Sequence, residues 1–154
     1  MVERAHISDI ASLTALRLEF LQEDCGELSG EIKSKLIEAL PAYFEKNLNH
    51  NIFCYLIRET EEVVACAFLL IVEKPANPMF ITGRTGTVLN VYTKPICRHK
   101  GYAKAMMKTL LQDAVELNLS FVELESTEAG YDLYKSIGFT DDVSKYHCMK
   151  WFNV

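Results

Sequence analysis

The chain has 154 residues, of which 49% are hydrophobic and 24% are charged, and its formal net charge is −5. These numbers fit one domain over residues 1–154 with a buried core, and the negative charge argues against binding nucleic acid over the whole surface. No apolar run approaches the roughly 20 residues that span a bilayer, and the N-terminus lacks the apolar core of a signal peptide. We therefore expect a cytoplasmic protein with no membrane partner.

A short strand and a first helix are predicted at the start of the chain. Residues 2–5 read as the strand. Ser8 is the expected N-cap of a helix over residues 10–21, where apolar side chains recur at helical spacing. The helix would end at Asp24-Cys25-Gly26, because glycine and aspartate favour turns.

A second helix and a hairpin follow. Apolar residues recur at helical spacing over residues 31–47, and Pro41 is expected to kink or interrupt this helix. The period then changes, and residues 52–57 and 63–72 read as two strands rich in β-branched and aromatic side chains. The polar residues 59–62 between them suit a hairpin loop.

The middle of the chain holds the clearest helix. Proline and glycine mark residues 75–86 as an irregular connection, and residues 87–92 form a further strand. From 103 to 114 apolar residues recur at i, i+3, i+4, i+7, i+8 and i+11, which predicts an amphipathic helix that ends near Asn118.

Three shorter elements complete the predicted order. They are a strand over residues 121–125, a helix over 128–136 that ends at Gly138, and a last strand over 146–152. Antiparallel hairpins come first and a strand-helix-strand crossover follows. The fold class is therefore mixed α/β (α+β), with a central, mostly antiparallel sheet and four helices on its two faces.

The five cysteines are widely spaced and form no Cys-x-x-Cys pair. Free thiols in a reducing compartment are the simplest interpretation. The four histidines are equally scattered, so the sequence predicts no metal site.

Residues 74–112 contain no Asp or Glu but seven Lys and Arg residues, so this stretch is +7 and the remainder is −12. Within it, Arg98-His99-Lys100-Gly101-Tyr102-Ala103 lies between a predicted strand and the clearest helix. A helix N-terminus attracts anions, and glycine allows backbone N–H groups to approach a phosphate closely. The motifs of P-loop and dinucleotide-binding folds are absent. We expect a phosphate site; the alternative is a turn glycine in a solvated basic helix start.

A second candidate group lies in the helix predicted over residues 128–136. Tyr131, Tyr134 and Lys135 fall within one turn of each other, and a phenol in a crevice can donate a proton to a leaving group. The alternative is that Tyr134 packs in the core and Gly138-Phe139 only ends the helix.

Together the two segments resemble the GNAT superfamily of acyl-CoA-dependent N-acyltransferases. Residues 98–103 match its cofactor pattern R/Q-x-x-G-x-G/A, and Leu133-Tyr134-Lys135-Ser136-Ile137-Gly138-Phe139 matches L-Y-x-x-x-G-F. Leu89-Asn90-Val91-Tyr92-Thr93-Lys94-Pro95 also looks like the strand and exit that precede the cofactor loop. The match is specific over residues 87–139 and covers the rest by element order.

The resemblance implies a sheet splayed at a bulge in the strand over residues 87–92, with acetyl-CoA in the splay. Backbone groups of Leu89 and Val91 would pair with the pantetheine amides, and the pyrophosphate would bind the amides of residues 98–104. Tyr134 would protonate the CoA thiolate. The cofactor contacts that the resemblance implies are Leu89, Asn90, Val91, Arg98, His99, Lys100, Gly101, Tyr102, Ala103, Lys104, Thr127 and Tyr131.

Two departures from the family pattern stand out. Thr127 occupies a position where many members have asparagine, and residues 74–112 offer no carboxylate as general base. The base is therefore open between a water relay, Glu125, whose strand would point into the crevice, and the other residues of suitable type, which are Glu73, Glu123, Glu128 and His147.

The predicted activity is acetyl transfer from acetyl-CoA to a primary amine by direct attack, on a small molecule or a peptide, by a possible homodimer. The first alternative is a non-catalytic acyl-CoA-binding sensor on the same scaffold, and the second is a small nucleic-acid-associated domain that uses the basic stretch. Polyamines, aminoglycosides, amino acids and protein N-termini all remain candidate acceptors. Five acidic residues of the helical region favour a cationic one: Glu19, Glu23, Asp24, Glu27 and Glu31.

Overall fold

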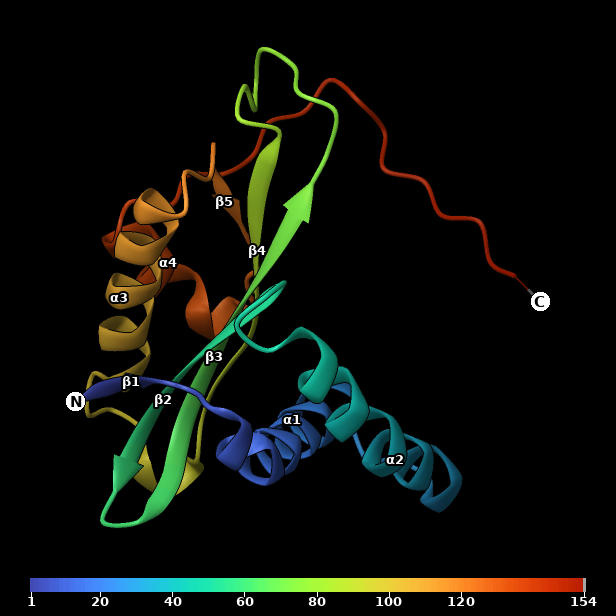
Figure 1. Ribbon diagram of the computed structural model, residues 1–154, viewed down its shortest axis with the longest axis vertical. Helices are drawn as coiled ribbons and strands as arrows, with labels where there is room; N and C mark the ends of the chain where they lie inside the picture. Colours follow the sequence, from blue (N-terminus) through green and yellow to red (C-terminus); the bar gives the residue numbers. More distant parts are fainter. Residues whose placement is uncertain (154) are drawn as a thin grey trace.

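The computed structural model describes residues 1–153 and contains a five-stranded sheet in the order β1-β2-β3-β4-β5 (Figure 1). The first four strands pair antiparallel, and β5 pairs parallel to β4. The strands are β1 (Val2–Arg4), β2 (Ile52–Glu59), β3 (Glu62–Glu73), β4 (Arg84–Thr93) and β5 (Val122–Glu123). The mixed, mostly antiparallel sheet predicted from the sequence is confirmed.

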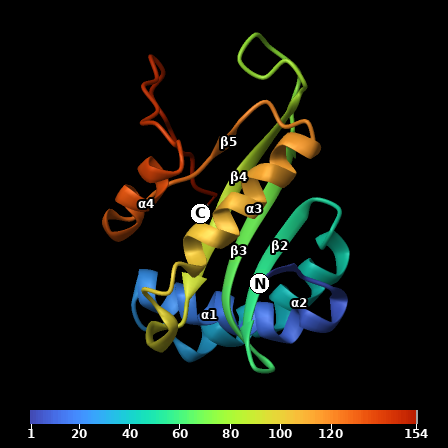
Figure 2. The same ribbon diagram turned by 90° about the vertical axis from the view of Figure 1, so that its left-hand side faces the viewer.

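Helices cover both faces of this sheet (Figures 1 and 2). One face carries α1 (Ile10–Cys25) and α2 (Gly30–Asn47), and the other carries α3 (Tyr102–Glu116); α4 (Tyr131–Ser136) is a short helix after β5. Along β2 the side chains alternate between two hydrophobic cores: Phe53, Tyr55 and Ile57 pack toward α3, whereas Ile52, Cys54 and Leu56 pack toward α1 and α2. Burial on both faces explains why β2 is apolar at nearly every position.

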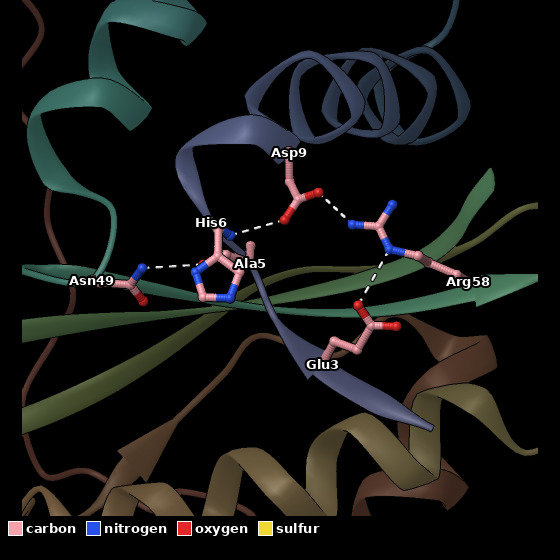
Figure 3. Close-up of polar contacts among 6 residues, drawn as sticks. All are labelled: Glu3, Ala5, His6, Asp9, Asn49 and Arg58. Carbon is pink, nitrogen blue, oxygen red and sulfur yellow. Dashed lines mark hydrogen bonds and ion pairs between the residues drawn. The ribbon is translucent and has the colours of Figure 1, made fainter. Parts of the chain in front are cut away.

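The start of α1 differs from the prediction that Ser8 caps it. Ser8 lies in a short 3-10 turn, and the first helix begins at Ile10 with Asp9 before it. Asp9 accepts the His6 N–H (2.8 Å) and pairs with Arg58 of β2, while Arg58 Nε also bonds Glu3 of β1 at 3.2 Å (Figure 3). Asp9 precedes α1 without a side-chain cap bond, and its carboxylate instead ties this turn to β2 through Arg58.

Asp9 is also electrostatically favoured as an ion. The residue as a whole is only 7% exposed. Burial alone would raise its pKa, but the His6 amide and the Arg58 guanidinium outweigh burial and lower the pKa of Asp9. In the segment before β2, Asn49 Nδ2 donates to the Ala5 carbonyl at 3.1 Å (Figure 3). Asn49 and Arg58 therefore both anchor the connection between β1 and α1.

Pro41 lies inside α2 without ending it, so the predicted interruption does not occur. Proline removes one N–H donor, which leaves the carbonyl four residues earlier, at Ile37, without its helical partner. Ile37 is exposed, and water can therefore take the place of that donor.

The C-terminal part departs most from the sequence prediction. The strand expected over residues 121–125 shortens to β5, and the strand expected over 146–152 does not form. Residues 141–153 are exposed and extend away from the rest of the molecule (Figure 1). The apolar alternation there is typical of a strand, but a strand needs a partner, and within residues 1–153 none lies beside it. Within residues 1–153, no helix combines the length and apolarity needed to cross a bilayer.

Candidate active site

The sheet opens between β4 and β5. These strands pair at only two positions, Gly86 with Val122 and Thr87 with Glu123, and then separate. Between Cys66 and Phe68 of β3 the β3–β4 register shifts by one residue, which places a β-bulge in β4. The splay predicted at a bulge in this strand is therefore present.

The ladder indicates which backbone groups of β4 face the gap. Gly86 donates its N–H to Phe121 beside β5, so three residues later Leu89 faces β3, where it pairs with Phe68. Beyond the bulge Lys94 donates to Val64 of β3, and alternation directs the backbones of Val91 and Thr93 toward the gap. Of the two backbone positions predicted for pantetheine, Val91 thus faces the gap. Leu89 does not, although its side chain is exposed.

The bulge is built on Asn90. Its φ of 54° is in the left-handed region, which asparagine tolerates better than most residues. Its buried side chain donates to Cys66 Sγ (3.3 Å) and accepts from Arg17 Nη1 of α1 (3.1 Å). Burial raises the pKa of the Cys66 thiol to about 12 and lowers that of Arg17. Asn90, predicted as a cofactor contact, therefore has its side chain engaged in joining α1 to the sheet.

The gap leads to the N-terminus of α3. Gly101 precedes the helix with φ 80°, and no side chain caps it. The first helical bond runs from Ala105 N–H to Gly101 O, so the N–H groups of Tyr102, Ala103 and Lys104 have no partner within the helix. A Cβ at Gly101 would meet nothing within 4 Å. This loop therefore offers unpaired amides beside open space, which is the geometry of an anion site.

The basic side chains around this loop are held by carboxylates from other elements. Arg98 forks onto both oxygens of Glu23 in α1 (2.8 and 2.6 Å) and donates from Nε to Thr93 O (2.9 Å). Lys100 and the Tyr102 hydroxyl both reach Glu59 at the end of β2, each at 2.7 Å. The hydrogen bond from Lys100, followed by that from Tyr102, lowers the pKa of Glu59.

A third pairing continues this pattern. Lys94 contacts Glu62 at the start of β3 and lies 4.0 Å from Glu19 of α1. The sequence stretch of +7 is thus partly neutralised in space. These partners could not be predicted from the sequence because each lies more than 30 residues away along the chain, as in the separation of 75 between Glu23 and Arg98. Two of the acidic residues that favoured a cationic acceptor, Glu19 and Glu23, are engaged here.

Two basic residues of the predicted phosphate site have no carboxylate partner among residues 1–153. Over residues 1–153, no ion pair involves Lys104 in the first turn of α3 or His99 in the loop, which has φ 63°. Both side chains are exposed. Lys104 is the cation nearest in sequence to the unpaired amides that has no competing carboxylate.

Tyr134 is half-buried in α4 and packs edge-on against Phe139, with ring centroids 5.9 Å apart. A Cβ at Gly130 would lie 2.9 Å from its ring, so glycine is needed there for the ring to fit. Burial raises its pKa, and its hydroxyl has no hydrogen-bond partner among residues 1–153. The aromatic packing expected as the alternative is real, yet it leaves a protonated hydroxyl free.

The other predicted contacts of this region are otherwise engaged. Thr127 caps the turn before α4, where its Oγ1 accepts the Gly130 N–H at 3.2 Å. The Tyr131 hydroxyl donates to the carboxylate of Asp141 (3.0 and 2.9 Å), which also pairs with Lys135 at 3.3 Å. The hydrogen bond to Asp141 is the main reason that the pKa of Tyr131 is raised.

The candidate general bases do not gather at one point. All of them are exposed, and His147 lies in the extended C-terminal segment. They are Glu73, Glu123, Glu125, Glu128 and His147. No cluster of three or more His, Cys, Asp or Glu able to hold a metal occurs within residues 1–153.

Comparisons with known proteins agree on one family. A sequence model described as the acetyltransferase (GNAT) family matches residues 16–139. Comparison with curated proteins found no significant match. The chain superposes with a TM-score of 0.83 on a predicted acetyltransferase from Clostridium acetobutylicum solved with acetyl-CoA, at 26% identity over 97% of this chain and 95% of that one.

Two further solved structures share the fold. A GCN5-related N-acetyltransferase from Ralstonia eutropha JMP134 has a TM-score of 0.75 and 21% identity over 97% of both chains. A ribosomal-protein-alanine N-acetyltransferase from Brucella melitensis biovar Abortus 2308 has a TM-score of 0.69 and 21% identity over 97% of this chain and 99% of that one. At these identities the likeness is one of fold.

Proposed function

Because the chain belongs to the GNAT family of acetyltransferases, we propose that it transfers an acetyl group from acetyl-CoA to a primary amine. The observation that carries the proposal is the juxtaposition of two incomplete backbone elements. β4 directs unpaired backbone N–H and C=O groups toward the gap between β4 and β5. The loop that follows β4 ends at α3, which begins with unpaired N–H groups. A long cosubstrate with an amide chain at one end and a diphosphate at the other needs both.

The diphosphate would bind at the start of α3. The N–H groups of Tyr102, Ala103 and Lys104 lack helical acceptors, and the helix dipole places partial positive charge there. Gly101 leaves the approach open, and Lys104 adds a cation without a carboxylate partner among residues 1–153. Arg98 and Lys100, by contrast, would first have to leave Glu23 and Glu59.

The pantetheine arm would lie along β4 as an added strand. Its amides would meet the backbones of Val91 and Thr93, which face the gap, in the way an extended peptide adds to a sheet edge. The Thr93 carbonyl already accepts from Arg98, so its N–H is the group that remains for a ligand.

In the chemical step the neutral amine would attack the thioester carbonyl carbon. The Val91 N–H, aimed into the gap, would stabilise the oxyanion that forms. As the carbon–sulfur bond breaks, Tyr134 would give its proton to sulfur. Burial keeps the pKa of Tyr134 above its ordinary value, so the phenol retains that proton through the neutral range. The proton lost by the amine would pass through water to solvent or to an exposed carboxylate.

A thiol-release assay with acetyl-CoA and a panel of amines tests this proposal. The panel should contain polyamines, aminoglycosides, amino acids and peptides with free N-termini. We expect at least one amine to give turnover and a mass increase of one acetyl group in the product. Saturable acetyl-CoA binding without turnover on any amine would instead establish the non-catalytic sensor, and absence of binding would overturn both.

A further inference from the structure

Arg17 of α1 is a half-buried cation with no counterion among residues 1–153. Its Nη1 donates to Asn90 Oδ1 at 3.1 Å, and its guanidinium carbon lies 5.6 Å from the centre of the Phe20 ring. No ion pair within residues 1–153 involves it. Burial is the main influence on the pKa of Arg17 and lowers it. Because a partly desolvated cation without a counterion is costly, an anion bound beside this one would be favoured.

The other four arginines of the chain each have a partner that carries negative charge. Three of them pair with carboxylates: Arg4, Arg58 and Arg98. The fourth, Arg84, donates from Nη1 to the Leu117 carbonyl at 2.8 Å, at the end of α3, where a helix carries partial negative charge. Arg17 is thus the exception, since the acceptor that it has is a neutral amide.

The remaining donors of Arg17 are open to a ligand. Its Nε and Nη2 make no hydrogen bond within residues 1–153, and both still reach solvent. Asn90 and Phe20 fix the position of the guanidinium, so little rotamer freedom remains to be lost when a ligand binds. A carboxylate can accept two parallel N–H bonds from such a group, whereas an ammonium, which has no lone pair, can accept none.

Arg17 lies beside the place where the proposed chemistry would occur. Asn90, its hydrogen-bond partner, immediately precedes Val91, whose N–H would stabilise the oxyanion. The Leu89 side chain is on the α1 face of the sheet, because Leu89 pairs with Phe68, and Phe68 packs toward α1 and α2. Leu89 is 37% exposed, so this face is open next to the reacting carbon. An amine that enters on this face therefore meets Arg17.

A second polar group borders the same place from α2. Tyr43 is close enough for the charge of Arg17 to oppose the rise in the pKa of Tyr43 that burial causes. The Tyr43 hydroxyl makes no hydrogen bond within residues 1–153. Tyr43 also lines a hollow of about 450 Å³ between α2 and the end of β3, with Asn47 and Glu73 among its other residues. A hollow of this size accommodates part of a small molecule.

We propose that Arg17 binds the carboxylate of the acceptor, and that the acceptor is therefore a free amino acid. The acceptor role rests on the proposed acetyl transfer, because the amino group must reach the thioester beside Val91. The amino group would point toward Val91, the carboxylate toward Arg17, and the side chain toward Tyr43 and the hollow beyond it. The products are the N-acetyl amino acid and CoA, whose sulfur receives the proton of Tyr134. Polyamines and aminoglycosides would instead bring further positive charge to Arg17.

Matched acids and amides test this recognition in the wild-type protein. The probes are free L-amino acids, each compared with its own α-amide, in the thiol-release assay at saturating acetyl-CoA. In the pair that reacts best, we expect kcat/KM to be about thirtyfold higher for the acid, as charge-assisted hydrogen bonds to one carboxylate predict. The amino group of the amide is less basic and more often neutral, so this preference cannot come from deprotonation. Amides or polyamines used as well as the acids would overturn the inference.

Arg17→Gln shows whether this residue is the source of the preference. Glutamine keeps a donor for Asn90 but carries no charge. The KM for the acid should rise about thirtyfold and that for the amide should change less than about threefold, while acetyl-CoA affinity stays as in the wild type. Lys33→Gln, which removes an exposed charge from α2, is the matched control and should leave both KM values unchanged. Equal losses on acid and amide would show that Arg17 only supports the bulge at Asn90, and would overturn the inference.

Calorimetry separates this inference from the proposed function. Amino acids and their amides are titrated into wild-type protein saturated with CoA, which has no acetyl group to transfer. Binding of an acid but not of its amide, without turnover, would support the carboxylate site and remove acetyl transfer. If neither acids nor amides bind or react, the inference is overturned, whereas acetylation of another amine would still uphold the proposed function. Both wild-type measurements decide the question even if Arg17→Gln does not fold.

Discussion

The two edges of β5 are each left without a complete partner strand, but their surroundings differ. On the inner side β4 diverges after two paired positions, and the gap leads to the unpaired amides of α3. On the outer side apolar residues of α3 and the α4 exit form a groove. Free backbone groups alone therefore do not define a ligand. A positive helix end suits a small anion, whereas an apolar groove suits a protein strand.

The largest effect is expected from a charge placed on the inner side. Gly101→Asp should weaken acetyl-CoA binding about a thousandfold, or about 4 kcal/mol, because the carboxylate repels the diphosphate and the left-handed backbone disfavours aspartate. Isothermal titration calorimetry measures this. Gly26→Asp is the matched control, since Gly26 has φ 83° and equally open space but lies at the end of α1. Unchanged affinity in Gly101→Asp would remove the diphosphate site.

The second effect tests the chemistry at the inner gap. Tyr134→Phe should lower kcat about a hundredfold with the KM for acetyl-CoA changed less than about threefold, because a general acid acts in the transition state. Tyr131→Phe is the control, since its hydroxyl is engaged with Asp141, and should retain most activity. Wild-type kcat should not fall up to pH 9, because burial raises the pKa of Tyr134. Equal losses in both variants would indicate a packing role.

The smallest effect concerns the carboxylates around the inner site. Glu59→Gln should tighten acetyl-CoA binding about threefold at pH 7, because it frees Lys100 and removes an exposed negative charge near the diphosphate. Since the pKa of Glu59 is lowered, its carboxylate stays charged at pH values below the ordinary glutamate pKa, and the difference should vanish only as pH falls through the lowered pKa. Glu61→Gln, in the adjacent turn, should have no effect; an equal gain there would mean that only net charge matters.

Local patterns predicted most of the fold. The apolar spacing of α3 placed Met106, Met107, Leu110 and Ala114 inside, and all four are buried. The prediction was wrong where a second segment decides the outcome. Ser8 has the right chemistry for a cap, but Asp9 directly precedes α1 and its carboxylate pairs with Arg58, 49 residues away in sequence. The strand over residues 146–152 had the right pattern but finds no neighbour among residues 1–153.

The sequence by itself determined the start of α3, because a left-handed glycine followed by helix-forming residues acts over a single turn and leaves its amides unpaired wherever the helix lies. Only the tertiary structure decided that Glu23 and Glu59 hold Arg98 and Lys100, and that Val91 rather than Leu89 faces the gap. It also decided that residues 146–152 lack a partner strand within residues 1–153. These depend on strand register and helix packing, which bring together residues that no local preference relates.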